Sequence, residues 1–299
     1  MIEIQKLTKQ FDKVTALDEL ELTVENGTVV GLIGSNGGGK STLLRVLSGV
    51  YMPDGGEVLI DGERPFDNPA VKGDCFFVND FPYFYNDSTL KNTAALYRKI
   101  YPHWSDEEYA RCREVFPLDE KQRIINMSKG MQRQAALTIA LSTRPKYLFL
   151  DEIFDGLDAV IRLALKRLLA ERVAEHDMTV VIASHNLREL EDLCDRICLL
   201  HKGKVIVQRE TDELRAAYRK VQVGFSDVPP TGIHFNGINV VSVFRNGNVF
   251  NLTVKGTEDD FMPRLEAMSP AFISAMPLTL EEVFLSEMEA AGYDAYHID

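Results

Sequence analysis

Residues 34–41 read Gly-Ser-Asn-Gly-Gly-Gly-Lys-Ser and fit the pattern G-x-x-x-x-G-K-[ST] at every fixed position. A loop of this kind suits phosphate, because glycines let the backbone N–H groups point inward and the following helix N-terminus attracts anions. Lys40 can reach the β- and γ-phosphates of a nucleotide, and the Ser41 hydroxyl can bind Mg²⁺. The segment therefore predicts a phosphate-binding turn between a strand and a helix.

The flanking sequence supplies that strand and that helix. Residues 29–33 predict a short buried strand, and residues 42–47 predict a helix with Leu43, Leu44 and Leu47 on one face. This context disfavours the alternative, a glycine-rich turn with an incidental lysine. The predicted nucleotide-contacting residues of the segment are Gly34, Ser35, Asn36, Gly37, Gly38, Gly39, Lys40, Ser41 and Thr42.

Composition narrows the class of protein. The chain has 299 residues, of which 45% are hydrophobic and 26% charged, and its formal net charge is −12. Because nucleic-acid binding needs cationic surface, we expect no nucleic-acid partner. No apolar run of about 18 residues predicts a membrane span, and no signal peptide is evident, so we expect a cytoplasmic location. Four scattered cysteines favour buried free thiols over a zinc site or disulfides.

Strand and helix patterns alternate over the first two thirds of the chain. Residues 147–150 and 179–183 predict buried strands, and residues 86–143 look mainly helical. The apolar residues between the two strands fall near one helical face: Ile161, Leu165, Leu168 and Leu169. Strands that alternate with helices predict an α/β fold with a mostly parallel sheet.

Residues 218–299 follow a different pattern and predict a small α+β appendage. Val221, Val223 and Phe225 alternate as in a strand, and residues 245–248 suit a hairpin turn. Further positions have helical or loop character: Phe261, Leu265 and Met268 in one helix, Val283, Phe284 and Met288 in a last helix capped from Thr279, and Pro229 and Pro230 in a loop.

A second set of functional residues follows the strand at 148–150. Asp151 at the strand end can hold Mg²⁺ through water, and Glu152 can orient or deprotonate an attacking water molecule. Two carboxylates at a strand end are weak evidence alone, since they are often only solvated. Their position about 110 residues after a phosphate loop makes the prediction strong.

Several further segments complete a resemblance to a known family. Residues 126–133 (Asn-Met-Ser-Lys-Gly-Met-Gln-Arg) are similar to the signature segment LSGGQ-QR, and residues 156–158 to the loop that crosses between subunits. His185 stands where a switch histidine is usual, and Phe11 where an aromatic residue stacks on adenine. Over roughly residues 2–210 the chain thus resembles the ATP-binding-cassette (ABC) ATPases.

The resemblance assigns roles that the residues alone leave open. By itself, Ser128 is a helix N-cap, His185 is a structural or capping histidine, and Phe11 is a core residue. The resemblance implies that Ser128 and Gly130 bind the γ-phosphate of a neighbouring subunit and that Asp158 lies in the crossing loop. It also implies that His185 is catalytic and that Phe11 binds adenine.

The chain departs from the family pattern at several positions. Asp80 stands where glutamine is usual, and we expect its carboxylate to approach Mg²⁺ directly or through water. Lys129 replaces the first glycine of the signature segment, and Met131 replaces its glutamine. The proline usual two residues after Asp151 is missing, for which the sequence offers no physical explanation.

The resemblance implies a P-loop ABC ATP-binding domain at residues 1–217, with a helical subdomain at about 80–145 and an accessory domain at 218–299. It implies ATP and Mg²⁺ as cofactors and two such domains paired head to tail. The implied function is the ATPase subunit, peripheral on the inner face of the membrane, of an exporter of drug, peptide or lipid type with a separate permease. An importer ATPase with a regulatory tail, or an ABC ATPase acting on ribosomes or DNA, are alternatives. The sequence identifies neither the substrate nor the permease, and does not distinguish a homodimer from a heterodimer.

Overall fold

The computed structural model describes residues 1–227 and 233–283. The chain divides into two compact units, Met1–Gln208 and Arg209–Asp299. The boundary between the units, at 208/209, lies nine residues before the boundary at 217/218 that the sequence suggests. Helix α8 (Thr211–Ala217) therefore belongs to the second unit. Phe284, Met288, Pro229 and Pro230 lie outside the described residues.

The first unit is built on a six-stranded sheet with the order β5-β6-β7-β3-β8-β9. The neighbours from β5 to β8 pair in parallel. Every residue of β3, β6 and β7 is buried, as expected for a parallel sheet covered on both faces. The strands are β3 (Val29–Ile33), β5 (Cys75–Val78), β6 (Tyr147–Asp151), β7 (Thr179–Ser184), β8 (Arg196–His201) and β9 (Lys204–Glu210).

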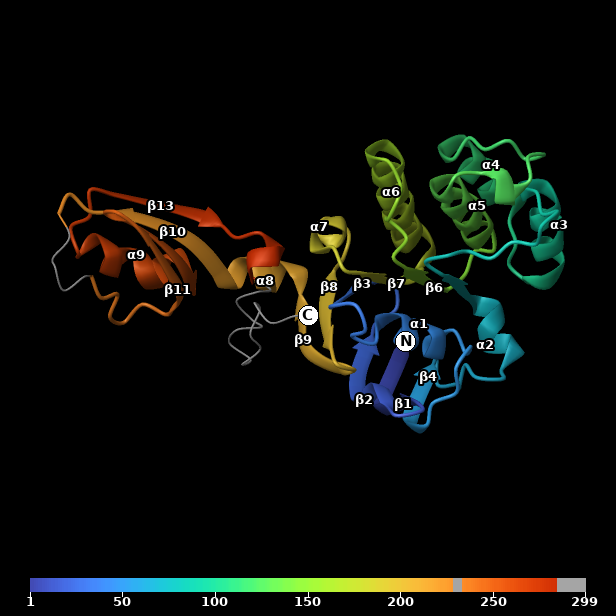
Figure 1. The fold of residues 1–299 in the computed structure, drawn as a ribbon, viewed down its shortest axis with the longest axis horizontal. Coiled ribbons are helices and arrows are strands. Elements are labelled where there is room, and N and C mark those ends of the chain that lie inside the picture. The colour runs from blue at the N-terminus through green and yellow to red at the C-terminus, as the bar shows by residue number, and fades with distance from the viewer. Residues whose placement is uncertain (228–232, 284–299) are drawn as a thin grey trace. The chain divides into compact units, whose positions relative to one another are not determined.

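Helix α1 (Lys40–Leu47) joins this sheet to a second, antiparallel sheet. That sheet has the order β2-β1-β4, formed by β1 (Ile2–Phe11), β2 (Val14–Val24) and β4 (Gly55–Ile60). The helix packs between the two sheets (Figure 1), and its apolar side chains share one core with residues of both. The helix that begins within the phosphate loop is therefore held on two sides.

Other helices gather on the far side of the parallel sheet (Figure 1). A capping box at Thr89 opens α3, and the Ser105 hydroxyl accepts the Glu108 amide at the start of α4. The helices of the first unit after α1 are α2 (Pro69–Asp74), α3 (Leu90–Ile100), α4 (Asp106–Val115), the short 3₁₀ helix η1 (Ile124–Asn126), α5 (Lys129–Ser142), α6 (Ala159–His176) and α7 (Leu187–Leu190).

The strand register brings the predicted functional segments to one edge of the sheet. Ile33 at the end of β3 pairs with Ser184, and Asp151 at the end of β6 pairs with Ala183. Because parallel strands end at the same edge, the phosphate loop, Glu152 and His185 all follow carboxyl ends that lie side by side. This is the edge at which sheets of this type bind ligands.

The second unit is an α+β fold with its own core. Its antiparallel sheet has the order β11-β12-β10-β13, and its buried side chains include Val221, Val223 and Phe261. Gly247, with φ of 60°, makes the predicted hairpin turn between β11 and β12. The elements are β10 (Tyr218–Gly224), β11 (Val240–Asn246), β12 (Val249–Lys255), α9 (Glu258–Glu266) and β13 (Phe272–Pro277).

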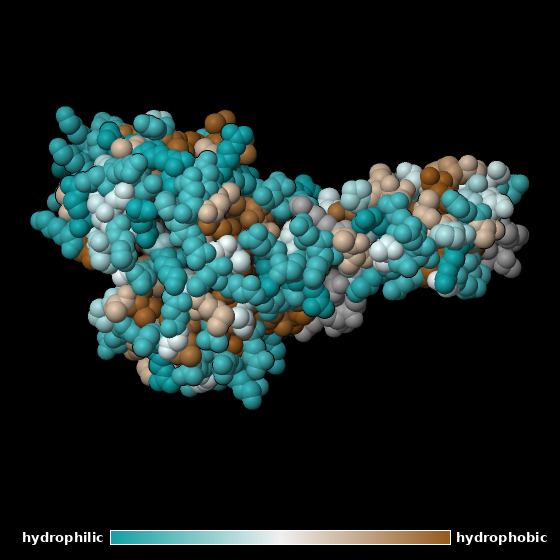
Figure 2. Space-filling model, turned by 180° about the vertical axis from the view of Figure 1, so that it is seen from behind, coloured by the Kyte–Doolittle hydropathy of each residue, from teal (hydrophilic) through white to brown (hydrophobic). Residues whose placement is uncertain are grey.

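The surface and the cysteines agree with the composition. Figure 2 shows one face of the molecule, on which hydrophilic side chains predominate and hydrophobic ones form small patches. All four cysteines are buried and free, as the sequence predicts. Within residues 1–227 and 233–283, no helix is both long and apolar enough to cross a membrane. The α/β fold class, with its helical part and α+β appendage, is confirmed.

Candidate functional site: a phosphate loop and two carboxylates

The phosphate loop has the backbone geometry that its glycines predict. Gly39 has φ of 105°, and a Cβ atom there would lie 2.6 Å from the Ala16 carbonyl oxygen. At Gly34 a Cβ would lie only 2.0 Å from the Leu200 carbonyl oxygen. The loop therefore folds tightly against β2 and β8, and side chains at these two positions would push it out of place.

Lys40 is buried inside the loop. Its ammonium group donates hydrogen bonds to the carbonyl oxygens of Gly34 (2.6 Å) and Ser35 (3.2 Å) and lies 3.9 Å from a carboxylate oxygen of Glu152. Burial lowers the pKa of Lys40, while the charges of Glu152 and Asp151 raise it. The cation thus stands in the curve of the loop, held by backbone oxygens.

Ser41 and Asp151 form a pair of oxygen ligands. The Ser41 hydroxyl donates to Asp151 Oδ1 at 3.0 Å. Asp151 is fully buried, and its Oδ2 atom has no hydrogen-bond partner in the described part of the chain. Burial raises the pKa of Asp151, the hydrogen bond from Ser41 lowers it, and the charge of Asp80 raises it. An unpartnered buried carboxylate oxygen beside a hydroxyl fits a hard cation such as Mg²⁺.

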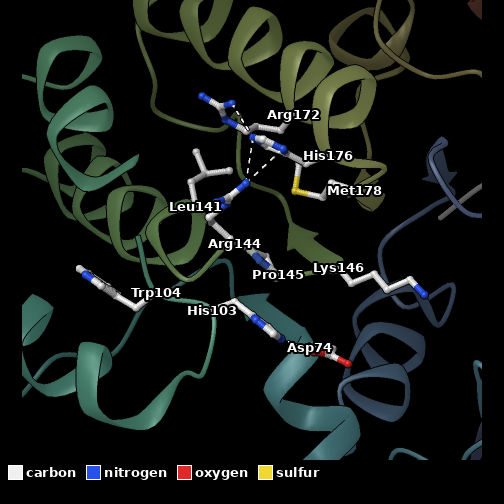
Figure 3. Close-up of a pocket in the computed structure, with 10 residues that line it drawn as sticks. All are labelled: Asp74, His103, Trp104, Leu141, Arg144, Pro145, Lys146, Arg172, His176 and Met178. Atoms are coloured by element: carbon white, nitrogen blue, oxygen red, sulfur yellow. Dashed lines mark hydrogen bonds and ion pairs between the residues drawn. The ribbon is translucent and has the colours of Figure 1, made fainter. Parts of the chain in front are cut away.

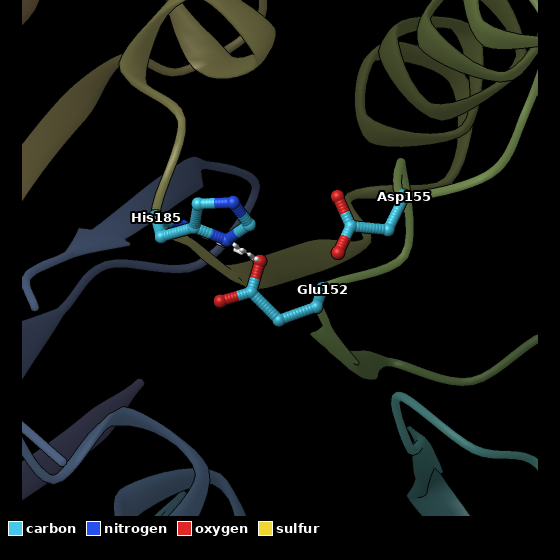
Figure 4. Close-up of side chains that lie close together, drawn as sticks. All are labelled: Glu152, Asp155 and His185. Atoms are coloured by element: carbon cyan, nitrogen blue, oxygen red, sulfur yellow. Dashed lines mark hydrogen bonds and ion pairs between the residues drawn. The ribbon is translucent and has the colours of Figure 1, made fainter. Parts of the chain in front are cut away.

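Glu152 and His185 meet directly at the sheet edge (Figure 4). Nδ1 of His185 lies 2.9 Å from Glu152 Oε2, and the His185 backbone N–H donates to the same oxygen at 3.3 Å. Glu152 has φ of 47°, a left-handed conformation that is uncommon for glutamate. The histidine therefore fixes the direction of a carboxylate that its own backbone already holds in an unusual position.

Asp155 belongs to the same cluster, although the sequence analysis gave it no role. Ligand-type atoms of Glu152, Asp155 and His185 all lie within 4.8 Å of one another, and Figure 4 shows the Asp155 carboxylate turned toward the other two side chains. Its only signal in the sequence is its place in the acidic segment 151–155. Two carboxylates and an imidazole at this spacing can orient a water molecule or hold a cation.

Arg133 links this cluster to Asp80. Its guanidinium donates to the backbone carbonyl of Asp155 and, at 3.1 Å, to that of Asp80. The Asp80 side chain accepts the Phe81 amide at 2.9 Å. In the sequence Arg133 is only the last residue of the signature-like segment. Its contacts with Asp155 and Asp80 become visible only in the structure.

The signature-like segment forms the start of α5. The Ser128 hydroxyl accepts a hydrogen bond from the Met131 amide at 3.2 Å. Ser128 is therefore a helix N-cap, the role that the residue alone predicts. A Cβ atom at Gly130 would lie 2.7 Å from the Gly156 carbonyl oxygen, so this glycine allows close contact with the loop before α6. Asp158 caps α6 by accepting the amides of Val160 (3.0 Å) and Ile161 (2.9 Å).

Phe11 is a surface residue. It is 39% exposed, so the core position that the residue type alone suggests is wrong. Its ring meets the Tyr51 ring edge-on, with centroids 5.2 Å apart, and the Lys9 ammonium lies 5.4 Å from its centroid. A partly exposed ring is available for stacking, which keeps adenine binding as a prediction.

Comparison with known proteins identifies the family. The model of the family "ABC transporter" matches residues 17–155. The "ABC transporter ATP-binding protein YtrB" of Bacillus subtilis (strain 168) is 31% identical over 289 residues, which are 96% of this chain and 98% of that protein. This chain belongs to the ABC transporter ATP-binding proteins. It is an ATP-binding cassette and an ATPase, as the resemblance predicts.

Other relatives match a smaller share of the chain. The "Bacitracin transport ATP-binding protein BcrA" of Bacillus licheniformis is 30% identical and covers 74% of this chain and 73% of its own. The "Sulfate/thiosulfate import ATP-binding protein CysA" of Synechococcus elongatus is 30% identical, and the alignment spans 68% of this chain and 61% of that protein. The relatives therefore include one named for the transport of bacitracin and one named for the import of sulfate or thiosulfate.

Solved structures show the same fold. A structure described as the ATP-binding subunit of an ABC transporter has a TM-score of 0.66 at 28% identity, covering 72% of this chain and 92% of that one. A cassette described as a dimer bound to ADP and Pi has a TM-score of 0.63 at 23% identity, with coverage of 71% and 99%. Both matches cover a share of the chain close to that of the first unit.

We predict that Lys40→Ala weakens ATP binding by at least about tenfold to a hundredfold, because it removes a charged donor from the phosphate loop and leaves the glycine backbone in place. Calorimetric titration with ATP measures the effect. Lys121→Ala, a change at an exposed lysine, is the matched control. Unchanged ATP affinity in a folded Lys40→Ala protein would show that the loop does not bind the nucleotide phosphates.

Proposed function

We propose that this protein is the ATP-hydrolysing subunit of an ABC exporter and acts on the cytoplasmic face of the membrane with a separate permease. The observation that carries the hydrolytic part is the meeting of Lys40, Asp151, Glu152 and His185 at one sheet edge. A phosphate-binding cation, an oxygen site for a metal and a positioned carboxylate are the parts that phosphoryl transfer to water requires.

In this proposal Glu152 receives the proton of the attacking water and His185 is the positioning residue. The contact of 2.9 Å between them, together with the backbone N–H of His185, keeps the Glu152 carboxylate directed toward the phosphate loop. Lys40 lies 3.9 Å from the same carboxylate, so the proposed base and the phosphate-binding lysine border the same part of the site. In this proposal a bound nucleotide would lie between the two charges, with its phosphates on Lys40 and the attacking water on Glu152.

Mg²⁺ is the proposed metal, with Ser41 and Asp151 as its protein ligands, directly or through water. The unpartnered Oδ2 of Asp151 supports this assignment, because burial of a carboxylate oxygen without a partner is costly unless a ligand supplies one. Asp80 is a third proposed contributor. Its negative charge raises the pKa of Asp151.

We also propose that two such domains pair head to tail. The exposed Ser128, with Gly130 and Asp158, would then complete the nucleotide site of the second domain, and Phe11 would stack on the adenine. The amides at the start of α5 and the Ser128 hydroxyl form a group of donors suited to a γ-phosphate. The accessory unit after residue 208 would add contacts to the pair or regulate its closure.

An exposed aromatic groove is the proposed contact for the permease. A cavity of about 570 Å³ lies along α3 and the segment before it. Tyr83 and Tyr85 on its wall are 83% and 65% exposed, and Leu96 and Ile100 add apolar surface from α3. Large exposed aromatic side chains that gather in one groove are typical of a protein interface.

Export is proposed over import. The relative named for bacitracin transport matches 74% of this chain, and the relatives named for sulfate/thiosulfate import match 68% to 71% of it. Import with a regulatory accessory unit is the second candidate, favoured by the several relatives named as sulfate importers. The substrate itself is not assigned.

Glu152→Gln is expected to bind ATP with near-normal affinity and to hydrolyse it about 10² to 10⁴ times more slowly, because an amide cannot accept the proton of water. ATP should also trap this variant as a dimer. Phosphate release and light scattering measure the two effects, with Glu107→Gln on the exposed face of α4 as control. Near-normal turnover would move the role of base to another group, His185 first.

Asp80→Gln, which restores the usual family residue, is predicted to keep ATPase activity and to shift its Mg²⁺ dependence to higher concentration. A carboxylate attracts Mg²⁺ more strongly than an amide does. The measurement is a Mg²⁺ titration of steady-state hydrolysis, with Asp80→Ala beside it. If both variants titrate like the wild type, Asp80 does not face the metal and the alignment of this loop with the family is wrong.

The direction of transport can be tested in proteoliposomes that contain this subunit and its permease, with the ATPase side outward. ATP added outside should drive bacitracin, the first probe for an exporter, into the lumen. The importer alternative predicts that ATP drives enclosed sulfate out of the vesicles. The Glu152→Gln subunit is the control for ATP-dependent movement in either direction, and sulfate efflux alone would reverse the proposed direction.

A further inference from the structure

A second cavity lies at the edge of the parallel sheet opposite the phosphate loop (Figure 3). Its volume is about 580 Å³, within the range of small-molecule sites. Lys146 and Met178 on its wall come just before β6 and β7, whereas Asp151 and His185 come at or just after the ends of these strands. The length of the sheet therefore separates this cavity from the nucleotide site.

Two guanidinium groups meet one imidazole in this cavity. Arg144 Nη2 lies 3.2 Å from Nδ1 of His176, and Arg172 Nη1 lies 3.1 Å from Nε2 of the same ring (Figure 3). A neutral imidazole has one acceptor nitrogen, and guanidinium groups only donate. His176 can therefore accept a hydrogen bond from one arginine but not from both, and the cluster has more donors than acceptors.

The other charges around the cavity are already paired. Arg172 is only 4% exposed and contacts Glu108 (2.8 Å) and Glu175 (2.9 Å), while its Nη2 has no hydrogen-bond partner in residues 1–227 and 233–283. Lys146 pairs with Asp61, and His103 pairs with Asp74, the one carboxylate on the cavity wall.

Arg144 differs from these groups. In the part of the chain that the structure describes, no ion pair joins it to a carboxylate, and its side chain is exposed. It follows Thr143, the C-cap of α5, and has φ of 47°, at a position where helices usually have glycine. Arginine is less stable than glycine in this left-handed conformation. Its guanidinium places at the cavity a cation that no carboxylate of the described residues neutralises.

We propose that this cavity binds a small organic phosphate, with the phosphate on Arg144 and the organic part against the apolar wall of Trp104, Leu141 and Met178. The planar guanidinium of Arg144 donates two parallel hydrogen bonds to a phosphate, and Arg172 Nη2, which has no hydrogen-bond partner in the described residues, is a further donor on the cavity wall. The net charge of −12 repels large polyanions, which favours a small ligand.

The alternative is that Arg144 and His176 only offset the negative carboxyl-terminal end of α6. That role requires no ligand. It predicts that removing the Arg144 side chain lowers thermal stability and changes no binding property. Binding measurements on Arg144 variants therefore distinguish the two interpretations.

Trp104 gives a direct readout, because it is the single tryptophan of the chain and lines the cavity. Intrinsic fluorescence of the full-length protein is titrated with phenyl phosphate, inorganic phosphate and phenol at constant ionic strength. Calorimetry on the same samples detects binding that leaves the fluorescence unchanged. We expect phenyl phosphate to bind at least about threefold more tightly than inorganic phosphate, and phenol to bind least.

Four variants decide the assignment. Arg144→Gly suits the positive φ and removes the guanidinium, so it should fold and bind phenyl phosphate at least about tenfold more weakly, with Arg144→Lys between it and the wild type. Lys40→Ala, which weakens the separate phosphate loop, should keep the Trp104 fluorescence response to phenyl phosphate, and Arg64→Ala, at an exposed arginine paired with Glu57, should bind as the wild type does. No binding by either method, equal affinity for both phosphates, or equal affinity in Arg144→Gly and wild type would overturn the proposal. Loss of binding in Lys40→Ala would also overturn it, by placing the phosphate in the nucleotide site.

Discussion

The parallel pairing of β6 with β7 is the constraint on which the nucleotide site depends. Asp151 pairs with Ala183, and one residue later the Glu152 amide still donates to the Ala183 carbonyl at 2.9 Å. This last hydrogen bond holds Glu152 in its left-handed conformation, beyond the end of the strand. The same register brings His185, two residues after Ala183, to the Glu152 carboxylate. A slip by one residue would turn these side chains to opposite faces of the sheet.

Burial of charge at this site favours a ligand. Lys40 is 6% exposed and lies 3.9 Å from a Glu152 oxygen, while Asp151 is fully buried and its Oδ2 atom has no hydrogen-bond partner in the described structure. Burial lowers the pKa of Lys40 and raises that of Asp151, so it disfavours the charged form of each group. Nucleotide phosphates and a divalent cation would supply the missing opposite charges. The site thus gives up stability in the free protein that a bound ligand restores.

Much of the site could be predicted because its residues lie in short continuous segments, within which local backbone geometry determines the residue pattern. The phosphate loop follows a fixed glycine pattern that includes Gly34 and Gly39, and an apolar strand that ends in two carboxylates marks Asp151 and Glu152. The carboxylate of Asp155 and the bridge from Arg133 could not be predicted. They depend on how the loop after β6 folds back on α5, and no pattern in either segment records that contact.

The cavity opposite the nucleotide site could not be predicted for a similar reason. Arg144, Arg172 and His176 come from the ends of two helices that are distant in the sequence, and each alone is an ordinary basic residue near a helix terminus. The exposed ring of Phe11 is a further case. An aromatic residue at the end of a strand resembles a core residue until the fold shows which side of β1 is covered.

Two residues that the sequence pattern sets apart from the family it resembles, Lys129 and Asp80, both lie near Phe81. Lys129, in place of a glycine, has its ammonium 5.8 Å from the centroid of the Phe81 ring, and Phe81 follows Asp80, in place of a glutamine. Arg133, one helical turn after Lys129, donates to the Asp80 carbonyl. One change adds a positive charge and the other a negative charge to the same region, so the net charge at this edge stays as in the usual family pattern.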